Sequence, residues 1–110
     1  DQIATCLKLI ERWHGAHGQR INIALLTPTL RREHLDELGA ELVEQAVSQA
    51  KETRRISRER GLVFTQDGHT TGSVAYAHEL GLLGPDALLS HSTDLTEEEI
   101  RICGETGTCI

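Results

Sequence analysis

The sequence is poor in aromatic residues, with one Trp, one Tyr and one Phe among 110 residues, and it contains no methionine. Its hydrophobic content of 38% is nevertheless typical of a globular chain rather than a disordered one. The core therefore has to be built from the aliphatic side chains of Leu, Ile, Val and Ala. A chain of this length forms one domain or part of one, with a small core.

The chain also lacks an excess of basic residues and any long apolar run. Its formal net charge of −6 argues against a nucleic-acid partner, because phosphates require a basic face. No apolar run approaches the ~20 residues of a membrane span. Residues 1–10 lack the basic start and the apolar stretch of a signal peptide. We therefore expect neither a nucleic-acid partner nor a membrane partner.

The cysteines Cys6, Cys103 and Cys109 are odd in number and form no CxxC pair, so they predict neither a disulfide framework nor a structural zinc site. Reduced thiols are typical of a cytoplasmic protein, which is the location we expect. The chain starts without Met in a helical pattern, and it stops at residues 107–110 where a strand begins. Both ends suggest a segment of a larger protein.

Strands and helices alternate along the sequence. Apolar runs predict buried strands over Ile21–Leu26, Leu62–Thr65 and Ala87–Ser90, and the start of a fourth at Thr108–Ile110. Helical spacing of apolar residues predicts one helix through Ile3, Leu7 and Ile10, a long one from about Leu35 to Arg60, and a short one capped by Thr70 or Thr71. The capping box Thr96-x-x-Glu99 opens the last helix.

This order of elements predicts parallel strands joined by right-handed crossovers. Both an open doubly wound sheet and a (β/α)8 barrel fit it. A complete barrel needs ~250 residues, so the chain would supply somewhat under half of one.

Ligands of parallel α/β folds bind at the carboxyl ends of the strands. That rule selects residues 27–29, 66–69 and 91–94. His69 and His91 lie in two of these segments, and imidazole suits both transition metals and acid–base chemistry near neutral pH. From adjacent strand ends, the two side chains can point into one pocket. The alternative is that each caps a loop or bonds to the backbone.

A basic run lies near the end of the long predicted helix and contains Lys51, Arg54, Arg55, Arg58 and Arg60. Glu52 and Glu59 are interleaved with it, and cations are favourable at a helix C-terminus. We interpret the run as a solvated helix end rather than a phosphate site.

The stretch Ala77–His91, which reads AHELGLLGPDALLSH, resembles a segment of the amidohydrolase superfamily. Leu95–Ile100 (LTEEEI), followed by Glu105–Thr108 (ETGT), resembles the continuation of that segment. The branch it resembles most is that of cytosine and guanine deaminases and triazine chlorohydrolases. The resemblance covers about residues 61–110, and the earlier half agrees mainly in the order of strands and helices.

The resemblance implies an α/β fold of the (β/α)8 TIM barrel type, holding one or two divalent metal ions, zinc or iron, that activate a water molecule. Residues 1–110 would form a partial metal-dependent hydrolase barrel domain, running from the helix before strand 4 to the start of strand 7. The family's His-x-His on strand 1 and its Asp on strand 8 would lie outside these residues.

In this family, strand 6 ends in a His that contacts the substrate or a metal, and His91 falls at that position. Strand 5 usually ends in a metal-binding His, followed three residues later by a Glu that shuttles protons. Those positions are Gln66 and His69 here. Either His69 takes over the metal role through a local shift, or this branch has lost part of the usual site.

We therefore expect a fragment of an amidohydrolase that hydrolyses a C–N bond of a small molecule in a deaminase-like reaction, and that is inactive by itself. His69 and His91 are the expected catalytic and metal-binding residues, and Gln66 and Asp67 are the expected substrate-binding residues. The alternative is a self-contained small α/β binding or interaction domain without catalysis. Because an arc of barrel leaves open strand edges, we also expect missing parent-chain segments or a second copy of the chain to complete the sheet.

Overall fold

The computed structural model describes residues 1–110 as an α/β fold with one three-stranded parallel sheet. The strands are β1 (Ala24–Leu26), β2 (Val63–Asp67) and β3 (Ala87–Ser90). The helices are α1 (Gln2–Trp13), α2 (Ala16–Gln19), α3 (Arg32–Leu35), α4 (Ala40–Arg60), α5 (Ser73–Glu79) and α6 (Glu97–Thr106). None of these helices combines the length and the apolar character needed to cross a membrane.

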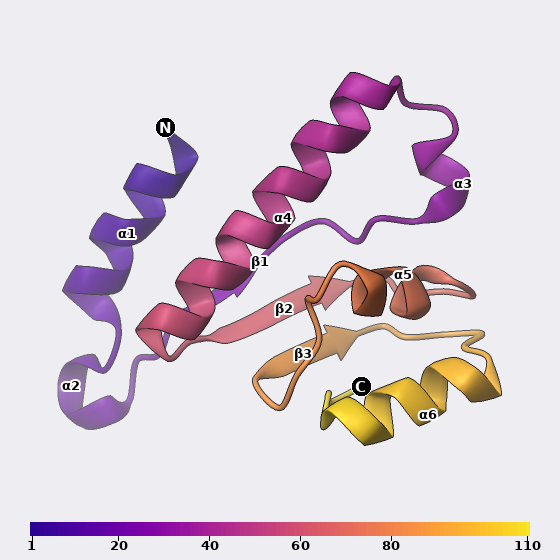
Figure 1. Ribbon diagram of the computed structural model, residues 1–110. Helices are drawn as coiled ribbons and strands as arrows, with labels where there is room; N and C mark the ends of the chain where they lie inside the picture. Colours follow the sequence, from indigo (N-terminus) through magenta and orange to yellow (C-terminus); the bar gives the residue numbers. More distant parts are fainter.

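The strands lie side by side in chain order and run parallel, as Figure 1 shows. After α6 the chain returns to the free edge of β3, where Cys109 forms a parallel bridge with Leu88. The Cys109 N–H donates to the carbonyl of Ala87, and its carbonyl accepts from the N–H of Leu89. The predicted parallel pairing of consecutive strands, including the start of a fourth, is therefore confirmed.

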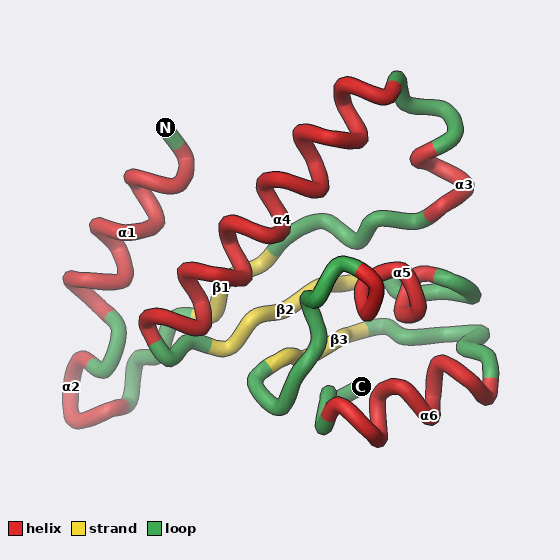
Figure 2. Tube along the Cα trace, viewed as in Figure 1, coloured by secondary structure: helices red, strands yellow, loops and turns green.

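Side chains along the strands alternate between a buried face and an open face. Phe64 in β2 and Leu89 in β3 are 0% exposed, whereas their neighbours Val63 and Leu88 are 46% and 43% exposed. The helices α4, α5 and α6 pack against the buried side chains (Figure 2). The sheet is thus covered by helices on one side only.

Two hydrophobic clusters fill the space under the helices. The larger cluster consists of Ala50, Phe64, Val74, Ala77, Leu82, Leu83, Ala87, Leu89, Ile102 and Cys103. The smaller cluster consists of Ile10, Leu25, Ile56 and Leu62. Apart from Phe64 and Cys103 both clusters are aliphatic, as the composition predicts.

The long predicted helix is interrupted near its start. α3 ends at Leu35, and α4 begins after Gly39, whose extended backbone forms the N-cap. The first turns of α4 extend away from the sheet (Figure 1). Leu42 in these turns is 53% exposed, and Leu38, just before the helix, is 42% exposed. The prediction of helix from Leu35 onward is wrong over residues 36–39, whereas its end at Arg60 is confirmed.

Two other predicted boundaries also differ from the structure. β1 is shorter than the predicted Ile21–Leu26, because Ile21 pairs back with Ala16 in an antiparallel bridge before the strand begins. β2 runs on to Asp67, two residues beyond the predicted end at Thr65. The carboxyl end of β2 therefore carries Asp67 within the sheet rather than in the following loop.

Candidate functional site

The open face of the sheet carries a polar cluster at the carboxyl ends of β2 and β3. Oδ1 of Asp67 accepts hydrogen bonds from Nδ1 of His91 at 2.7 Å and from Oγ of Ser90 at 2.8 Å. The side chains of Asp67 and His91 are 54% and 83% exposed, so a ligand can reach both. With Nδ1–H facing the carboxylate, the imidazole keeps the lone pair of Nε2 free. Asp67 and His91 therefore form an oriented acid–base pair.

The Asp67 carboxyl group is held in its ionised form. The hydrogen bond from Ser90 and the one from His91 lower the pKa of Asp67 below its usual range, by more than its desolvation raises it. An ionised carboxylate keeps the imidazole ring in place and stabilises its positive charge when Nε2 takes up a proton.

The backbone turns sharply after β3 to present His91. The φ angles of His91 and Asp94 are 50° and 52°, and such left-handed conformations cost non-glycine residues of order 1–3 kcal/mol. The Thr93 N–H donates to the His69 carbonyl at 3.0 Å, and the Ser92 hydroxyl donates to the Leu89 carbonyl at 3.0 Å. These hydrogen bonds hold the strained turn that directs His91 toward Asp67.

The loop after β1 closes over the end of β2. The Thr29 hydroxyl donates to the Asp67 carbonyl at 2.6 Å, and Nε of Arg31 donates to the Gly68 carbonyl at 2.9 Å. Gly68 has a φ of 81°, and a Cβ at this position would lie 2.7 Å from the Arg31 guanidinium. Position 68 therefore favours glycine, and the loop fixes the backbone that carries Asp67.

Gln66 and His69 lie on the helix-covered face, where they are 1% and 0% exposed. Nε2 of His69 is 3.1 Å from Oε1 of Gln66, and Nδ1 is 2.8 Å from the Ser73 hydroxyl. The Gln66 amide nitrogen donates to the Thr27 hydroxyl at 3.2 Å, which leaves its oxygen facing His69. Both imidazole nitrogens thus have hydrogen-bond partners within the chain, as expected if His69 has a structural role.

The structure brings the four residues expected in the site together as two separate pairs. Asp67 and His91 meet on the open face, whereas Gln66 and His69 face the helices. The physical reason is the two-residue period of a strand, which sends Gln66 and Asp67 to opposite faces. The expectation that His69 and His91 point into one pocket is therefore wrong, while the chemical role of each residue stays a prediction.

Burial also sets the protonation state of His69. It lowers the pKa of the imidazole to about 4, because the charged form loses its hydration; the field of Glu99 opposes this shift and that of Arg31 adds to it. His69 is therefore neutral at neutral pH.

The donor groups of the chain do not by themselves fit a catalytic metal. No group of three or more His, Cys, Asp or Glu side chains is placed to hold a metal ion, whereas a catalytic zinc site usually has three protein ligands. Nε2 of His91 and the second carboxylate oxygen of Asp67 are the free donor atoms of the pair. A zinc or iron ion would need its remaining ligands from outside residues 1–110.

Glu99 is a buried carboxylate, 1% exposed, with a role that the sequence only partly indicates. It completes the predicted capping box with Thr96. Its oxygens also accept from the N–H groups of Gly72, Val74 and Ala75 at 2.9, 2.9 and 3.1 Å. Burial raises the pKa of Glu99, but these backbone donors outweigh that effect and hold it below its usual range.

The predicted cap of the short helix is consequently wrong. The N-cap of α5 is Gly72, which has no side chain to donate or accept, rather than Thr70 or Thr71. The carboxylate of Glu99 supplies the missing acceptor from α6.

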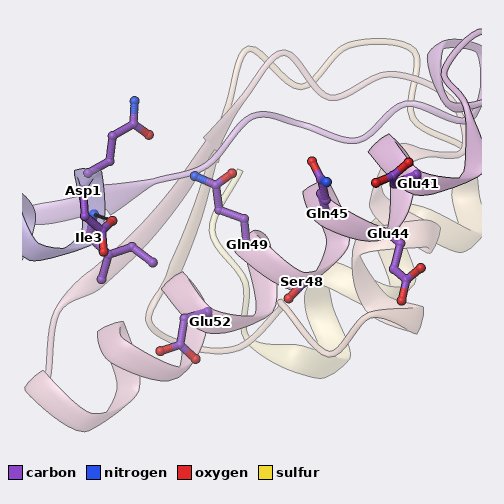
Figure 3. A pocket seen from close by; sticks show the side chains of 9 residues that line it. Asp1, Ile3, Glu41, Glu44, Gln45, Ser48, Gln49 and Glu52 are labelled. Atoms are coloured by element: carbon purple, nitrogen blue, oxygen red, sulfur yellow. Dashed lines mark hydrogen bonds between the residues drawn. The ribbon is translucent and has the colours of Figure 1, made fainter.

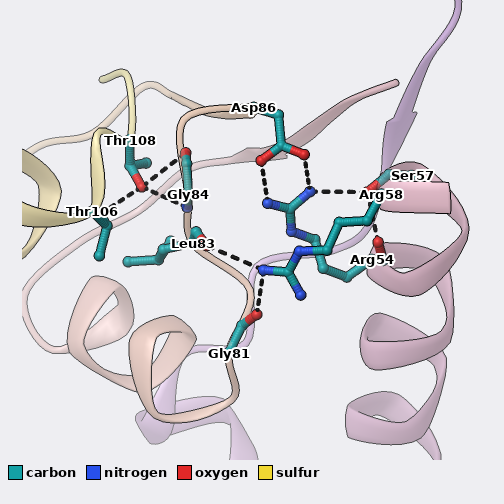
Figure 4. A network of polar contacts seen from close by, with 9 residues as sticks. All are labelled: Arg54, Ser57, Arg58, Gly81, Leu83, Gly84, Asp86, Thr106 and Thr108. Carbon is teal, nitrogen blue, oxygen red and sulfur yellow. Dashed lines mark hydrogen bonds and ion pairs between the residues drawn. The ribbon is translucent and has the colours of Figure 1, made fainter. Parts of the chain in front are cut away.

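The side chain of Arg54 is 1% exposed, so the interpretation of the basic run as a solvated helix end is wrong for this residue. Its guanidinium donates to the two carboxylate oxygens of Asp86 at 2.8 and 2.5 Å and to the Ser57 hydroxyl at 3.0 Å (Figure 4). It also lies 5.2 Å from the centre of the Phe64 ring. Arg54 thus ties the end of α4 to the turn before β3.

No protein-family model, curated protein or solved structure matches this chain.

Proposed function

We propose that residues 1–110 are part of the (β/α)8 barrel of an amidohydrolase that hydrolyses a C–N bond of a small molecule, in a deaminase-like reaction. The Asp67–His91 pair is the part of the active site that these residues supply. The contact between Asp67 and His91 on the open sheet face is the observation that carries the proposal.

The arrangement of the sheet supports the barrel. In chain order β1, β2 and β3 are neighbours, and the helices that connect them cover a single face. In a closed barrel the other face would line the interior, with its polar residues at the carboxyl ends of the strands. The open face fits this layout, because Val63 and Leu88 lie along it and Asp67 and His91 lie at its carboxyl end.

The pair supports the chemistry of hydrolysis. In a deamination, a water oxygen bonds to the ring carbon, the bond from that carbon to the amino nitrogen breaks, and a proton moves from the water to the departing ammonia. Nε2 of His91 can accept the water proton and return it to the leaving nitrogen, while Asp67 stabilises the intervening imidazolium. A divalent metal held by residues outside this segment would supply activation of the water.

The test uses the full polypeptide that contains these residues. Ammonia release would be measured on amino-substituted pyrimidines, purines and triazines, with zinc or iron supplied. We expect His91→Asn to lower kcat by about 10²–10⁴-fold, and Asp67→Asn to lower it as well, because an amide no longer selects the Nδ1–H tautomer. His78→Asn is the matched control, since His78 is exposed on α5.

Two results would decide against the proposal. Full activity of His91→Asn would show that the Asp67–His91 pair takes no part in the reaction. Absence of ammonia release from every substrate class by the metal-loaded protein would favour the alternative, a small α/β binding domain without catalysis.

A further inference from the structure

A hollow of about 240 Å³ lies between the C-terminal half of α4 and the turn that follows α5. Leu80, Gly81 and Leu82 line it from the turn, and Glu59 is the one acidic residue in its wall. Four of the 11 Lys and Arg residues of the chain line it from α4, although the chain carries a net charge of −6. These are Lys51, Arg54, Arg55 and Arg58.

Two of the four positive charges are balanced within the chain. Arg55 is paired with Glu52 and Glu59, so both neighbouring carboxylates of α4 are already engaged. The terminal nitrogens of Arg54 are paired with Asp86. A ligand in the hollow therefore has to be attracted by the two remaining charges.

Lys51 and Arg58 carry the charges that have no carboxylate partner. Both side chains are exposed, and neither takes part in an ion pair. Nη2 of Arg58 donates to the carbonyls of Gly81 and Leu83 at 3.0 and 3.3 Å (Figure 4). The guanidinium is thus held beside the hollow while its other N–H groups stay free, which lowers the entropy cost of binding an anion.

Arg54 gives an independent indication of a missing acceptor. Its side chain is 1% exposed and lines the hollow from within the protein. Nε of Arg54 is the one buried side-chain nitrogen or oxygen of the chain that has no hydrogen-bond partner. Because a buried donor without an acceptor is destabilising, this position favours an oxygen ligand from outside the chain.

The size and the charge of the hollow limit the class of ligand. Pockets for drug-sized molecules occupy about 300–1,000 Å³, so this hollow suits a small ionic group. Two unbalanced positive charges match the charge of a phosphate monoester, about −1.5 to −2 at neutral pH. Arginine also binds phosphate oxygens through parallel N–H donors, whereas lysine supplies a point charge.

The N-terminal half of the same helix disfavours an extended polyanion. A second hollow, between α1 and this half of α4, is shown in Figure 3. Its acidic residues are Asp1, Glu41, Glu44 and Glu52, and it contains no Lys or Arg. Nucleic acid laid along α4 would meet this negative charge, whereas a single phosphate group in the basic hollow would not.

We propose that a phosphate dianion, either free phosphate or the phosphate group of a small metabolite, binds in the basic hollow. Lys51 and Arg58 are its charged ligands, and Nε–H of Arg54 is a buried donor beneath it. The site lies toward the amino ends of the strands, because α4 leads into β2 and the turn after α5 leads into β3. It is therefore separate from Asp67 and His91, and a bound phosphate would tie α4 to the turn before β3.

Isothermal titration calorimetry of the full polypeptide that contains these residues tests the proposal. Inorganic phosphate and glucose 6-phosphate are the probes, and acetate is the singly charged comparison. We expect saturable one-to-one binding of phosphate with a Kd of about 1 mM, which weakens at high salt, and no binding of acetate at the same concentration. Tighter binding of glucose 6-phosphate than of phosphate would identify a phosphorylated metabolite, and the opposite order would identify the free ion.

Matched variants assign the charge and the buried donor. Lys51→Gln is expected to weaken phosphate binding about five- to tenfold, and Lys51→Arg is expected to retain it. Lys8→Gln is the charge-matched control, since Lys8 is an exposed lysine of α1. In protein labelled with ¹⁵N-arginine, the Nε–H signal of Arg54 is expected to move downfield as phosphate saturates the site.

Four results would overturn the proposal. Absence of saturable binding at phosphate concentrations tenfold above that Kd would reject the site. Acetate binding as tight as phosphate binding would make the ligand a carboxylate. Equal weakening in Lys51→Gln and Lys8→Gln would show only a general attraction of anions. An Arg54 Nε–H signal that does not move at saturation would place the phosphate elsewhere.

Discussion

Acidification is expected to destabilise the fold through His69 before the carboxylates titrate. The ordinary pKa of histidine is 6.5, and that of His69 in the fold is about 4. As the pH falls below 6.5, the unfolded chain takes up a proton at this residue, whereas the folded chain does not until about pH 4. The contribution of neutral His69 is thus fully present above pH 6.5 and is lost progressively between pH 6.5 and about 4.

The size of the effect follows from the shift. Each pKa unit corresponds to about 1.4 kcal/mol, so a change from neutral pH to about pH 5 is expected to lower the free energy of unfolding by about 2 kcal/mol. That is a large fraction of a net stability of about 5–15 kcal/mol.

Urea denaturation followed by far-ultraviolet circular dichroism measures this loss. With a slope of about 1–2 kcal/mol per molar urea, the midpoint is expected to fall by roughly 1–2 M over the interval. His69→Gln removes the titrating group, so its stability should be lower at neutral pH but nearly flat down to about pH 5. His78→Gln, at an exposed position, should keep the pH dependence of the wild type. The reasoning would be refuted if the wild-type urea midpoint did not move between neutral pH and about pH 5, or if His69→Gln showed the same pH dependence as the wild type.

Further substitutions test three other contacts. Gly68→Ala is expected to cost about 1–3 kcal/mol in thermal unfolding, through its left-handed φ and the contact with Arg31; an unchanged melting temperature would contradict this. Glu99→Gln is expected to cost about 2–3 kcal/mol in urea at neutral pH. It should also remove the part of the acid sensitivity that begins near the ordinary pKa of 4.5, where the unfolded chain takes up a proton at Glu99 and the folded chain does not. Equal stability at neutral pH would count against the role of Glu99. Asp86→Ala removes the carboxylate partner of the buried Arg54 guanidinium. Because the Asp86 side chain is 41% exposed, the expected cost is about 1–3 kcal/mol, more than that of Arg54→Met, which also removes the buried charge. The opposite order would show that the pair is not the main contact.

The order of the sheet could be predicted because local signals agree with one another. The run Ala87–Ser90 is short, apolar and preceded by a turn, and the structure has β3 over the same residues. Thr96 and Glu99 form the predicted capping box at the start of α6. Strands separated by helices pair in parallel, so the connectivity follows from the alternation alone.

The two faces of the sheet could not be assigned from sequence. Gln66 and Asp67 are adjacent polar residues at the end of β2, and alternation requires only that they face opposite ways. Which of the two side chains is buried depends on which set of alternate residues in β2 faces the helices. The packing of Phe64 under α4, α5 and α6 decides this. The sequence therefore could not predict that Asp67 and His91 share the open face whereas Gln66 and His69 share the helix-covered face.

Buried charges were missed because their partners are distant in the chain. Arg54 lies on the buried face of α4 together with Ala50 and Ser57, but the carboxylate that pairs with its charge is not on this helix. Its partner Asp86 lies 32 residues further on. Glu99 is similarly separated from Gly72 by 27 residues. Neither pairing has a local sequence signal.

The division of the interior into two clusters predicts that the chain opens in parts rather than as one unit. The smaller cluster holds α1 and β1 through Ile10, Leu25, Ile56 and Leu62, whereas the larger one holds β2, β3, α5 and α6. α4 contributes Ala50 to one cluster and Ile56 to the other, so it is the element they share. Partial unfolding that releases α1 and β1 leaves the larger cluster intact and costs less than global unfolding. Native-state hydrogen exchange should therefore sort the backbone amides into an early-exchanging N-terminal group and a late-exchanging group that includes the turn of α4 around Ala50.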